Sequence, residues 1–320
     1  MKKVVTLGGG TGHYSILRGL KNYDLDLTAV VSVVDNGGST GELRTDFGIL
    51  APGDIRNCLV ALSDETEIRD LARLFEYRFS KKSRRLGNHN VGNLILAALT
   101  DLCGDMAAAS KVASKILRTR GRVLPVSLDA STLYARTRGG KVLKGQLAVS
   151  YPEKRERIDE LWLKPAADIY AGTADALREA DLVLICPGDL YGSVLPNMIT
   201  RGMCEVLRSC RARIAYVCNL VTKQGSYDFS ASDFVREFIR YSGRRPDFVL
   251  YNTQKPSREV VDKYRKEASY FVAPDLWVLR SLCGRAIGAK LLQEHDSGDK
   301  RIVRHNSDLT ARLIIDILRG

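Results

Sequence analysis

Short runs of apolar, often β-branched residues alternate along the chain with longer amphipathic segments. Several of the short runs are almost wholly apolar, as expected for strands buried on both faces of a parallel sheet. The pattern predicts strands at Lys3–Leu7, Thr28–Val34, Arg122–Ser127, Leu182–Cys186, Ile214–Asn219, Phe248–Asn252, Tyr270–Ala273 and Arg301–His305.

The longer segments carry apolar residues at helical spacing and predict helices between these strands. Strands that alternate with helices indicate an α/β fold with a doubly wound, mostly parallel, Rossmann-like sheet flanked by helices. The predicted helices are Tyr14–Leu20, Asp54–Leu62, Glu67–Tyr77, Gly92–Thr100, Met106–Leu117, Ala166–Glu179, Leu195–Ser209, Ala231–Ser242, Arg258–Ala268 and Ser307–Leu318.

One segment, Thr132–Lys164, departs from this rhythm. Its runs TLYARTR, KVLKGQLAVS and ELWLKP alternate polar and apolar residues, and the pair Gly139-Gly140 separates the first two. This pattern predicts a small antiparallel β insertion at 132–164. Since no internal repeat or low-complexity linker divides the remainder, we expect a single α/β domain over residues 1–320.

The composition narrows the class of partner. The chain has 320 residues, is 45% hydrophobic and carries a net charge of +12, which suits nucleic acid, a membrane surface or an anionic small ligand. The basic residues are spread along the chain, however, and form mostly a solvated surface. Their densest cluster, Lys81, Lys82, Arg84 and Arg85, lacks the interleaved aromatic residues of a base-stacking platform. We therefore expect no nucleic-acid partner.

The cysteines and the apolar runs indicate the cellular compartment of the protein. The seven cysteines are scattered, and none forms a CxxC motif or a zinc spacing with the four histidines. Their odd number in a long chain favours reduced thiols. No apolar run approaches the roughly 18 residues of a spanning helix, and glycines interrupt the stretch behind the first lysines, which argues against a signal peptide. We expect a cytoplasmic protein without a membrane span.

The first candidate site is the stretch GGGTGH, directly behind the first predicted strand. A strand, a glycine-rich turn and a helix start form an anion site, because free N–H groups and the helix dipole point at the bound group. The candidate phosphate contacts are Gly9, Gly10, Thr11 and Gly12. Their spacing fits neither G-x-G-x-x-G nor the nucleoside-triphosphatase loop, which argues against a plain nicotinamide site and a nucleotide hydrolase. A tight turn that serves only packing is the alternative.

A second glycine-rich stretch, DNGGSTGELR, follows the second predicted strand. Two such loops at neighbouring strand ends face the same crevice in an open α/β sheet. Asp35 at the strand end is a candidate for a ribose contact or for a Mg²⁺ ion that bridges phosphates. Small hydroxyl residues and bare N–H groups would form an anion nest, although a β–α turn uses the same residues. The candidates here are Asp35, Asn36, Gly37, Gly38, Ser39, Thr40 and Arg44.

Two further stretches combine polar residues with a helix start. In LAPGDIRNCLVAL, Asp54 is predicted to cap a helix. Arg56 in its first turn opposes the helix dipole unless it faces an anion, and a surface arginine is the alternative. In LGNHNVGNLILAAL, Asn90 is predicted to cap the next helix. His89 and Asn93 are further candidate contacts, and a polar loop residue is the alternative role of His89.

Together these four stretches resemble the YvcK/CofD-like family, also called the gluconeogenesis factor family. The resemblance continues in ICPGDLYGSVLPN, YVCNLVTKQG and VRHN, so it covers nearly the whole chain. One branch of that family is a 2-phospho-L-lactate transferase that builds a deazaflavin cofactor with Mg²⁺. The other is a regulator that binds UDP-sugars such as UDP-N-acetylglucosamine and supports cell shape and growth on gluconeogenic carbon. DNGGSTGELR followed by PGDIRN resembles the second branch.

Two positions depart from the family's pattern. Asn36 stands where the family usually carries the second of two paired acids, which weakens a dicarboxylate metal site in this loop. Gly192 stands where a threonine is common, which removes a hydroxyl contact from that part of the site.

The later motifs also supply candidate contacts. Gly188 and Asp189 follow one strand and Asn219 ends the next, as a ligand crevice at strand ends requires, although caps and turns use the same residues. The resemblance places a sugar-nucleotide contact at Arg304 and at Tyr264. Arginine suits a bidentate phosphate contact, and a half-buried helix residue is the alternative role of Tyr264.

These observations predict a cytoplasmic UDP-sugar-binding regulator. In it, Gly9–Gly12 cradle one phosphate, Gly37–Thr40 or Arg304 reach the other, and Asn219 and Tyr264 position the uridine or the sugar. The alternative is a phospholactate-type transferase in which Asp35 holds Mg²⁺ between phosphates. An aromatic content of 7% argues weakly against the flavin-like acceptor pocket that such an enzyme needs. We also expect a homo-oligomer such as a dimer.

Overall fold

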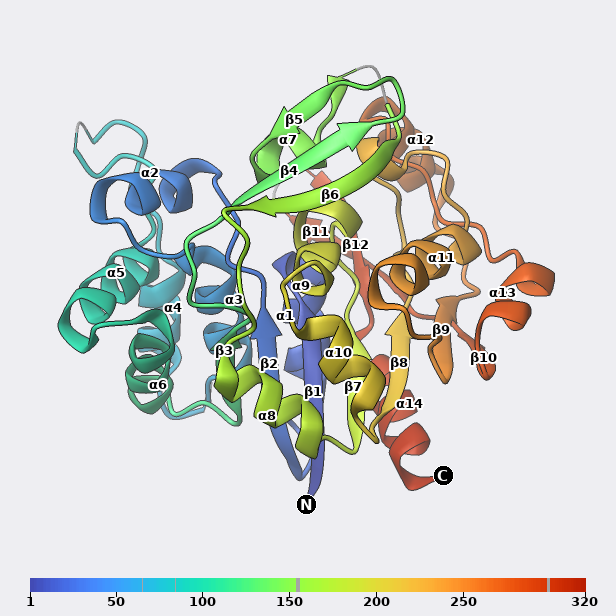
Figure 1. The fold of residues 1–320 in the computed structure, drawn as a ribbon, viewed down its shortest axis with the longest axis horizontal. Helices are drawn as coiled ribbons and strands as arrows, with labels where there is room; N and C mark the ends of the chain where they lie inside the picture. Colours follow the sequence, from blue (N-terminus) through green and yellow to red (C-terminus); the bar gives the residue numbers. More distant parts are fainter. Residues whose placement is uncertain (65, 84, 154–155, 298–299) are drawn as a thin grey trace.

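The computed structural model describes residues 1–64, 66–83, 85–153, 156–297 and 300–320. Within them, seven strands form one sheet in the order β10-β9-β8-β7-β1-β2-β3, and every neighbouring pair is parallel (Figure 1). These strands are β1 (Lys2–Gly8), β2 (Leu25–Val31), β3 (Arg122–Pro125), β7 (Leu182–Ile185), β8 (Arg213–Val217), β9 (Phe248–Asn252) and β10 (Arg285–Ala289). The doubly wound parallel sheet predicted from the sequence is confirmed.

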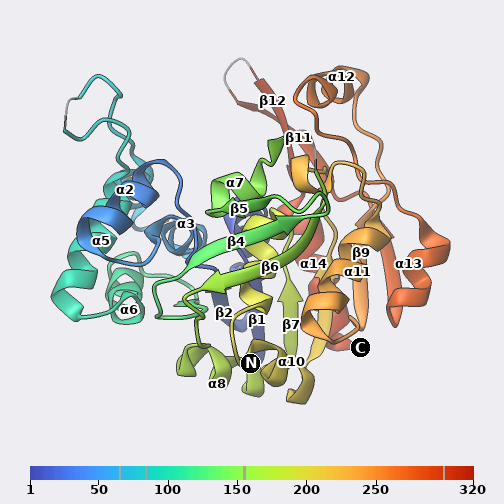
Figure 2. The same cartoon turned by 45° about the horizontal axis from the view of Figure 1, so that its top comes forward.

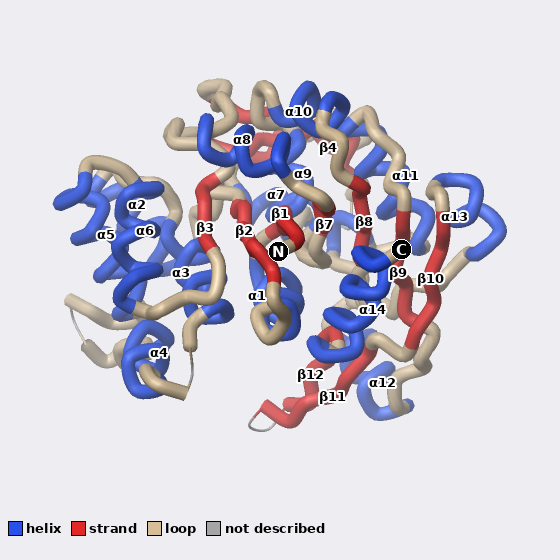
Figure 3. Tube along the Cα trace, turned by 90° about the horizontal axis from the view of Figure 1, so that it is seen from below, coloured by secondary structure: helices blue, strands red, loops and turns tan. Residues whose placement is uncertain are grey.

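Helices cover both faces of this sheet. Figure 3 shows α1 (Gly10–Leu20) and α14 (Ser307–Arg319) on one face, and α8 (Ala171–Glu179) and α10 (Met203–Ser209) on the other. The sheet is therefore the middle layer, and every residue of β7 is buried. This is the reason why the central strands are almost wholly apolar.

A group of helices lies beyond β3, at one end of the sheet (Figure 1). The polypeptide between β2 and β3 forms this group, and α3 and α6 contact β3. The helices are α2 (Gly38–Phe47), α3 (Pro52–Leu62), α4 (Arg69–Glu76), α5 (Val91–Cys103) and α6 (Met106–Ile116). Arg84 of the basic cluster lies outside the described residues.

The segment 132–164 forms the predicted antiparallel insertion, of which residues 154–155 lie outside the described part. Its strands pair in the order β5-β4-β6 and carry the short helix α7. Figures 1 and 2 show it above the carboxyl ends of the parallel strands. Its elements are β4 (Thr132–Thr137), β5 (Val142–Lys144), α7 (Gln146–Ser150) and β6 (Ile158–Lys164).

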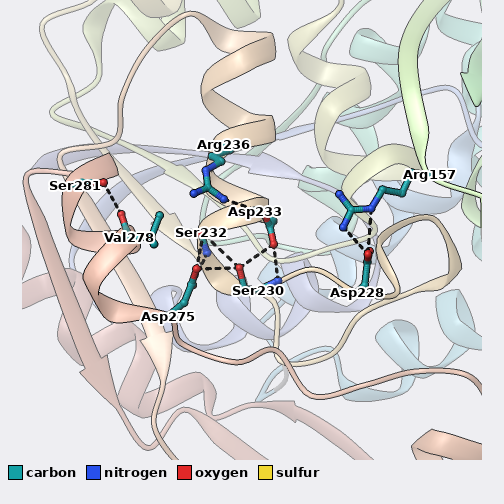
Figure 4. A network of polar contacts seen from close by, with 9 residues as sticks. All are labelled: Arg157, Asp228, Ser230, Ser232, Asp233, Arg236, Asp275, Val278 and Ser281. Carbon is teal, nitrogen blue, oxygen red and sulfur yellow. Dashed lines mark hydrogen bonds and ion pairs between the residues drawn. The ribbon is translucent and has the colours of Figure 1, made fainter. Parts of the chain in front are cut away.

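Polar contacts hold the insertion in this position. The Asn36 side chain accepts the Leu147 N–H at 3.1 Å, and Arg240 donates to the Asp159 carbonyl at 2.6 Å. Figure 4 shows a third contact, the ion pair between Arg157 and Asp228. The insertion is thus bonded both to the loop after β2 and to the region around α11 (Ala231–Ser242).

The start of α11 is bonded to α13 (Leu276–Leu282) through one carboxylate. Asp275 accepts the Ser232 N–H at 2.9 Å and the hydroxyls of Ser230 and Ser232, while Ser230 and Asp233 form a capping box (Figure 4). Because these bonds satisfy N–H groups that a helix start leaves open, the network stabilises the start of α11 and holds it against the residue that precedes α13.

Three of the predicted strands are corrected. β2 begins and ends three residues earlier than predicted, because β3 ends at Pro125, opposite Val31, and offers no partner beyond it. The stretch Tyr270–Ala273 forms only an isolated bridge, through Phe271 to Val221. Arg301–His305 lies outside the parallel sheet, in a hairpin of β11 (Leu292–Ser297) and β12 (Lys300–His305). The last parallel strand is instead β10, whose sequence RAIGA has only one β-branched residue and includes a glycine, and therefore gives little strand signal.

The predicted helices are largely confirmed, with boundary shifts and three corrections. The glycine-rich stretch 37–41 is predicted to be a loop, but Gly37 is the N-cap of α2 and the rest of the stretch belongs to that helix. The predicted helix Leu195–Ser209 is divided into a π-turn over Leu190–Val194, α9 (Leu195–Met198) and α10, with Gly202 at φ +86° between the last two. α8 begins five residues later than predicted, since Ala167 and Ile169 bond to Arg201 in extended conformation.

The remaining helix is α12 (Arg258–Lys266), which lies beside the β11–β12 hairpin (Figure 2). α12 and this hairpin share a small second core with the loop after β8. No helix in the described residues has the length and apolarity needed to cross a bilayer.

Phe238 on α11 provides a test of how this fold is stabilised. Its side chain is fully buried, with its ring 5.6 Å from that of Tyr216 on β8. Phe238→Ala should therefore lower the free energy of unfolding by about 3–5 kcal/mol, measured by urea denaturation. Trp277→Ala is the control: this side chain is 91% exposed, so a change within about 0.5 kcal/mol is expected. Equal losses in the two variants would contradict this account of the core.

Candidate ligand-binding site

The site candidate lies at the carboxyl edge of the sheet, between β1 and β7. From β1 the chain continues through β2 to β3 on one side, while β7, β8, β9 and β10 extend on the other side. Their junction is a topological switch point, where open α/β sheets bind their ligands. A cavity of about 570 Å³ opens there, lined by the ends of β1, β2, β7 and β8, by α12 and β12, and by the insertion.

The structure brings about half of the predicted contact residues into this cavity, and they come from separate stretches of the chain. Those that line it are Gly9, Gly10, Thr11, Gly12, Asp35, Asp54, Gly188, Asp189, Asn219, Tyr264 and Arg304. The predicted contacts that do not line it are Asn36, Gly37, Gly38, Ser39, Thr40, Arg44, Arg56, His89, Asn90 and Asn93.

The first glycine-rich stretch forms the floor of the cavity at the start of α1. Gly10 has a φ of +68°, which disfavours other residues. A Cβ at Gly12 would lie 2.1 Å from the Pro187 carbonyl oxygen, so this glycine allows α1 to approach the loop after β7. Packing thus explains part of the motif. These residues nevertheless line the cavity, at a helix start whose first amides have no partner within the helix.

Asp54 lies directly on this floor and bonds to it. Its carboxylate accepts the Gly10 N–H at 2.9 Å, and a Cβ at Gly9 would lie 2.4 Å from it. The prediction that Asp54 caps α3 is wrong, because the N-cap is Ala51 and Asp54 belongs to the first helical turn. Burial and, to a lesser extent, the nearby charge of Asp35 raise the pKa of Asp54 to about 6, although the bond from the Gly10 N–H opposes the rise.

Asp35 follows β2 and faces the same cavity. It accepts the Gly37 N–H at 2.9 Å. Burial raises the pKa of this carboxyl, while bonds from Gly37 and Thr40 and the charge of Arg44 oppose the rise. Asp35 and Asp54 are thus two carboxylates that repel each other on one wall. No cluster of three or more metal-ligating side chains occurs among the described residues, but Mg²⁺ commonly uses only one or two carboxylates together with phosphate oxygens.

The rest of the second glycine-rich stretch is the start of α2 and faces α5, away from the cavity. Ser39 bonds to His89 Nδ1 at 3.1 Å, and His89 Nε2 lies 3.0 Å from Glu42. Asn93 donates to Thr40 at 3.4 Å, and Asn90 caps α5 as predicted by accepting the Asn93 N–H. These residues connect two helices. The amides of Thr40 and Gly41 bond to the Gly37 carbonyl, and none of Gly37, Gly38, Ser39 and Thr40 lines the cavity.

Arg44 and Arg56, the two arginines of these stretches that are predicted to contact an anion, bond to other parts of the protein instead. Arg44 donates to the carbonyls of Val34, Asp35 and Ser131, and so connects α2 to the ends of β2 and β4. Arg56 points toward α5, where its carbons contact Gly92, and its guanidinium bonds to Asn57. Burial lowers the pKa of Arg56 to about 10. Neither arginine lines the cavity.

The opposite wall follows β7 and β8. Asp189 caps the π-turn as predicted, accepting the Gly192 N–H at 3.2 Å, and lies 3.5 Å from the Lys223 ammonium. Asn219 donates to the Gly188 carbonyl at 2.6 Å, while its own side-chain oxygen is buried and lacks a hydrogen-bond partner among the described residues. The buried hydroxyl of Ser32 likewise lacks one there. Both unsatisfied atoms belong to residues that line the cavity, where a ligand can complete their bonding.

Arg304 and Tyr264 form the third wall. Arg304 on β12 is partly buried and bonds to the Val303 carbonyl. Tyr264 is only 9% exposed, packs on Phe271, and its hydroxyl accepts the Val303 N–H at 3.0 Å. Tyr264 therefore acts mainly as a structural residue that holds β12 in place. His305 is buried, donates to the Cys218 carbonyl, and has its pKa lowered by burial to about 4.

Sequence reasoning missed several lining residues. Lys223 belongs to the motif YVCNLVTKQG, and its position four residues after Asn219 at a strand end is the signal that could have found it. Ser32 falls within a predicted strand and gives no sign of a contact. Gln146 and Tyr151 carry no signal either, because they reach the cavity only through the way the insertion folds back over the sheet.

Comparisons with known proteins agree with this architecture. The family model described as 2-phospho-L-lactate transferase CofD matches residues 4–292. A relative from Thermotoga maritima is 39% identical over 320 residues, covering 99% of each chain. The gluconeogenesis factor of Bacillus subtilis is 38% identical over 322 residues, covering 99% of this chain and 98% of its own. A crystal structure of a Bacillus halodurans protein superposes with a TM-score of 0.92 at 36% identity, covering 98% and 99% of the two chains.

The raised pKa of Asp54 predicts a stability change with pH. The folded protein holds this proton up to about pH 6, compared with an ordinary value of 3.8. Its stabilising contribution is therefore complete below about pH 4 and is lost as the pH rises through about 6. An asparagine at this position would keep an oxygen for the Gly10 N–H, so Asp54→Asn should raise the free energy of unfolding at pH 8 by about 1–2 kcal/mol. The gain should fade toward about pH 4 in urea titrations.

Asp64→Asn is the matched control with the opposite sign. Bonds from Thr66 and Arg120 lower the pKa of Asp64 to about 2, so that variant should lose stability at pH 8. If Asp54→Asn were also destabilised at pH 8, the electrostatic description of the cavity floor would be wrong.

Proposed function

Because the chain belongs to the CofD-like family and has relatives named gluconeogenesis factors, we propose that it is a cytoplasmic regulatory protein that binds a nucleotide sugar of the UDP-N-acetylglucosamine type. Through this ligand it would connect central carbon metabolism with cell shape and cell-wall synthesis. Binding would act by favouring one conformational or partner-binding state over another.

The observation that carries this proposal is the cavity at the switch point between β1 and β7. Its floor is the start of α1, which Gly9–Gly12 form and where the helix dipole favours an anion; the Gly10 N–H there is bonded to Asp54, so a phosphate would use the other amides of the first turn. The cations of Arg304 and Lys223 line the same cavity from β12 and from the loop after β8. A diphosphate in this space would pair with Arg304 and Lys223, while protonation of Asp54 or a divalent cation would offset the repulsion from Asp54 on the floor.

The two unsatisfied side chains suit the rest of such a ligand. Ser32 has a hydroxyl and Asn219 has an amide oxygen without a partner in the described residues. Ribose and sugar hydroxyls donate and accept hydrogen bonds, and therefore satisfy both. A cavity of about 570 Å³ also lies within the range usual for ligands of this size.

Arg304 gives the direct test of this function. Titration with UDP-N-acetylglucosamine in the absence of Mg²⁺ should raise the melting temperature of the protein without turnover. Arg304→Ala should weaken binding by about ten- to a hundredfold in calorimetry, because it removes charge-assisted bonds to phosphate. Arg301→Ala is the matched control on the same strand, since Arg301 is exposed and pairs with Glu259 and Asp296. Unchanged affinity in the Arg304 variant would remove that residue from the site.

The two carboxylates favour a second candidate, a Mg²⁺-dependent transferase of the 2-phospho-L-lactate type. Asp35 and Asp54 line one wall of the cavity and repel each other, and a divalent cation would relieve that repulsion. Bound to Asp35, Mg²⁺ would neutralise charge on the phosphates during group transfer. This candidate requires an acceptor beside the phosphates, such as the deazaflavin of the transferase branch.

An activity assay distinguishes the two candidates. Incubation with nucleotide-activated phospholactate, deazaflavin acceptor and Mg²⁺ should give no product if the protein only binds its ligand. Product that disappears in Asp35→Asn and persists in Asp316→Asn, a remote exposed carboxylate on α14, would establish the transferase instead. Chromatography of the deazaflavin product is the measurement.

A further inference from the structure

Two tyrosines line the cavity within the described residues, and they differ in availability. The ring of Tyr264 packs on Phe271 at 5.6 Å, its hydroxyl is bonded to Val303, and only 9% of the residue is exposed. Tyr151 is 53% exposed. A flat ligand group that enters the cavity therefore finds the ring of Tyr151 available, whereas that of Tyr264 is committed to the small core beside α12.

Tyr151 is also held in place. It follows α7, and its N–H bonds to the Leu147 carbonyl. The Lys223 ammonium lies 5.5 Å from the centre of its ring, a cation–π contact. Asp189 lies 3.5 Å from the same ammonium and is itself bonded to Gly192. Burial lowers the pKa of Lys223, but Asp189 and Tyr151 outweigh this effect and raise it, so the ammonium keeps its charge beside the ring.

The insertion that carries Tyr151 is bonded to the parallel sheet's own loops. Asn36 accepts the Leu147 N–H, and a Cβ at Gly192 would lie 2.3 Å from Ser150 Oγ. α7 thus packs closely against the π-turn over Leu190–Val194. The ring is therefore part of a built wall rather than of a free loop, and ordering it costs little entropy when a ligand binds.

On the premise of the nucleotide-sugar function above, we propose that Tyr151 is the platform on which the nucleobase of the ligand stacks. Gly9–Gly12 line the floor and Arg304 lines another wall, and the proposed function places the phosphates between them. The insertion forms the roof and contributes no cation to the described lining. A neutral aromatic ring attracts the face of a base, and Gln146 at the start of α7 brings an amide suited to a base edge. The insertion would then make the protein selective for ligands that carry a nucleobase.

The experiment compares a ligand that carries the base with ligands that lack it. Tyr151→Ala should weaken UDP and UDP-N-acetylglucosamine by the same factor, about 5- to 150-fold in calorimetry. Its affinity for pyrophosphate should stay within about twofold of that of the wild type. Tyr151→Phe, which keeps the ring, should bind UDP within about threefold of the wild type. Tyr77→Ala is the matched control, since Tyr77 is also 53% exposed but lies at the end of α4.

A spectroscopic variant gives an independent readout. Tyr151→Trp keeps a stacking ring, and its fluorescence should be quenched when UDP is added but not when pyrophosphate is added. The wild-type protein, with its two native tryptophans, provides the baseline.

The outcomes separate this inference from the proposed function. If wild-type protein binds UDP and Tyr151→Ala binds it equally well, the platform is wrong and the nucleotide-sugar function stands. If the variant loses affinity for UDP-N-acetylglucosamine but not for UDP, the ring contacts the sugar and the assignment to the base is overturned. If the wild type binds neither UDP nor its sugars, the proposed function fails and the inference fails with it.

Discussion

A carboxylate placed against the amino end of a helix is the constraint on which the cavity depends. Asp54 accepts the Gly10 N–H and lies against Gly9, so its oxygen atoms occupy the position where α1 would attract any anion. The backbone can bring Asp54 there only because glycine stands at position 9. The favourable amide bond and dipole are opposed by burial and by Asp35, which is why the carboxyl takes up its proton near about pH 6.

The position of Asp54 and its neighbours determines which charges a phosphate-bearing ligand would meet in the cavity. The described lining contains the carboxylates of Asp35, Asp54, Asp189 and Glu267 and the cations Lys223 and Arg304. A diphosphate entering this space adds further negative charge, so protonation of a carboxylate or a divalent cation must accompany it. The sugar-nucleotide sensor and the magnesium-dependent transferase therefore share one physical requirement and differ in whether an acceptor reacts. Repulsion between carboxylates such as Asp35 and Asp54 lowers the stability of the folded protein. Binding sites commonly keep such costly arrangements because the ligand needs them.

The insertion converts an open crevice into a covered cavity. In a doubly wound sheet without an insertion, the strand ends and the first turns of the helices supply the contacts to a ligand. In this chain α7 brings Gln146 and Tyr151 over those ends, and Asn36 and Arg240 hold the insertion there. Asn36 lies next to Asp35 in sequence, yet its side chain bonds to the insertion and does not line the cavity.

Local sequence determined the parallel α/β class, the antiparallel insertion and the glycine-rich floor, because apolar runs of strand length and glycines at a strand–helix junction depend on neighbouring residues alone. It also placed the caps at Asn90 and Asp189. The tertiary structure decided which of two similar glycine-rich stretches opens into the cavity. Gly9–Gly12 lines it, whereas Gly38–Thr40 is absorbed into a helix packed on α5. It also decided that Arg44 and Arg56 serve packing and that Lys223 and Tyr151 line the cavity. Such assignments depend on which distant segment lies opposite each side chain, and the order of residues along the chain does not encode this directly.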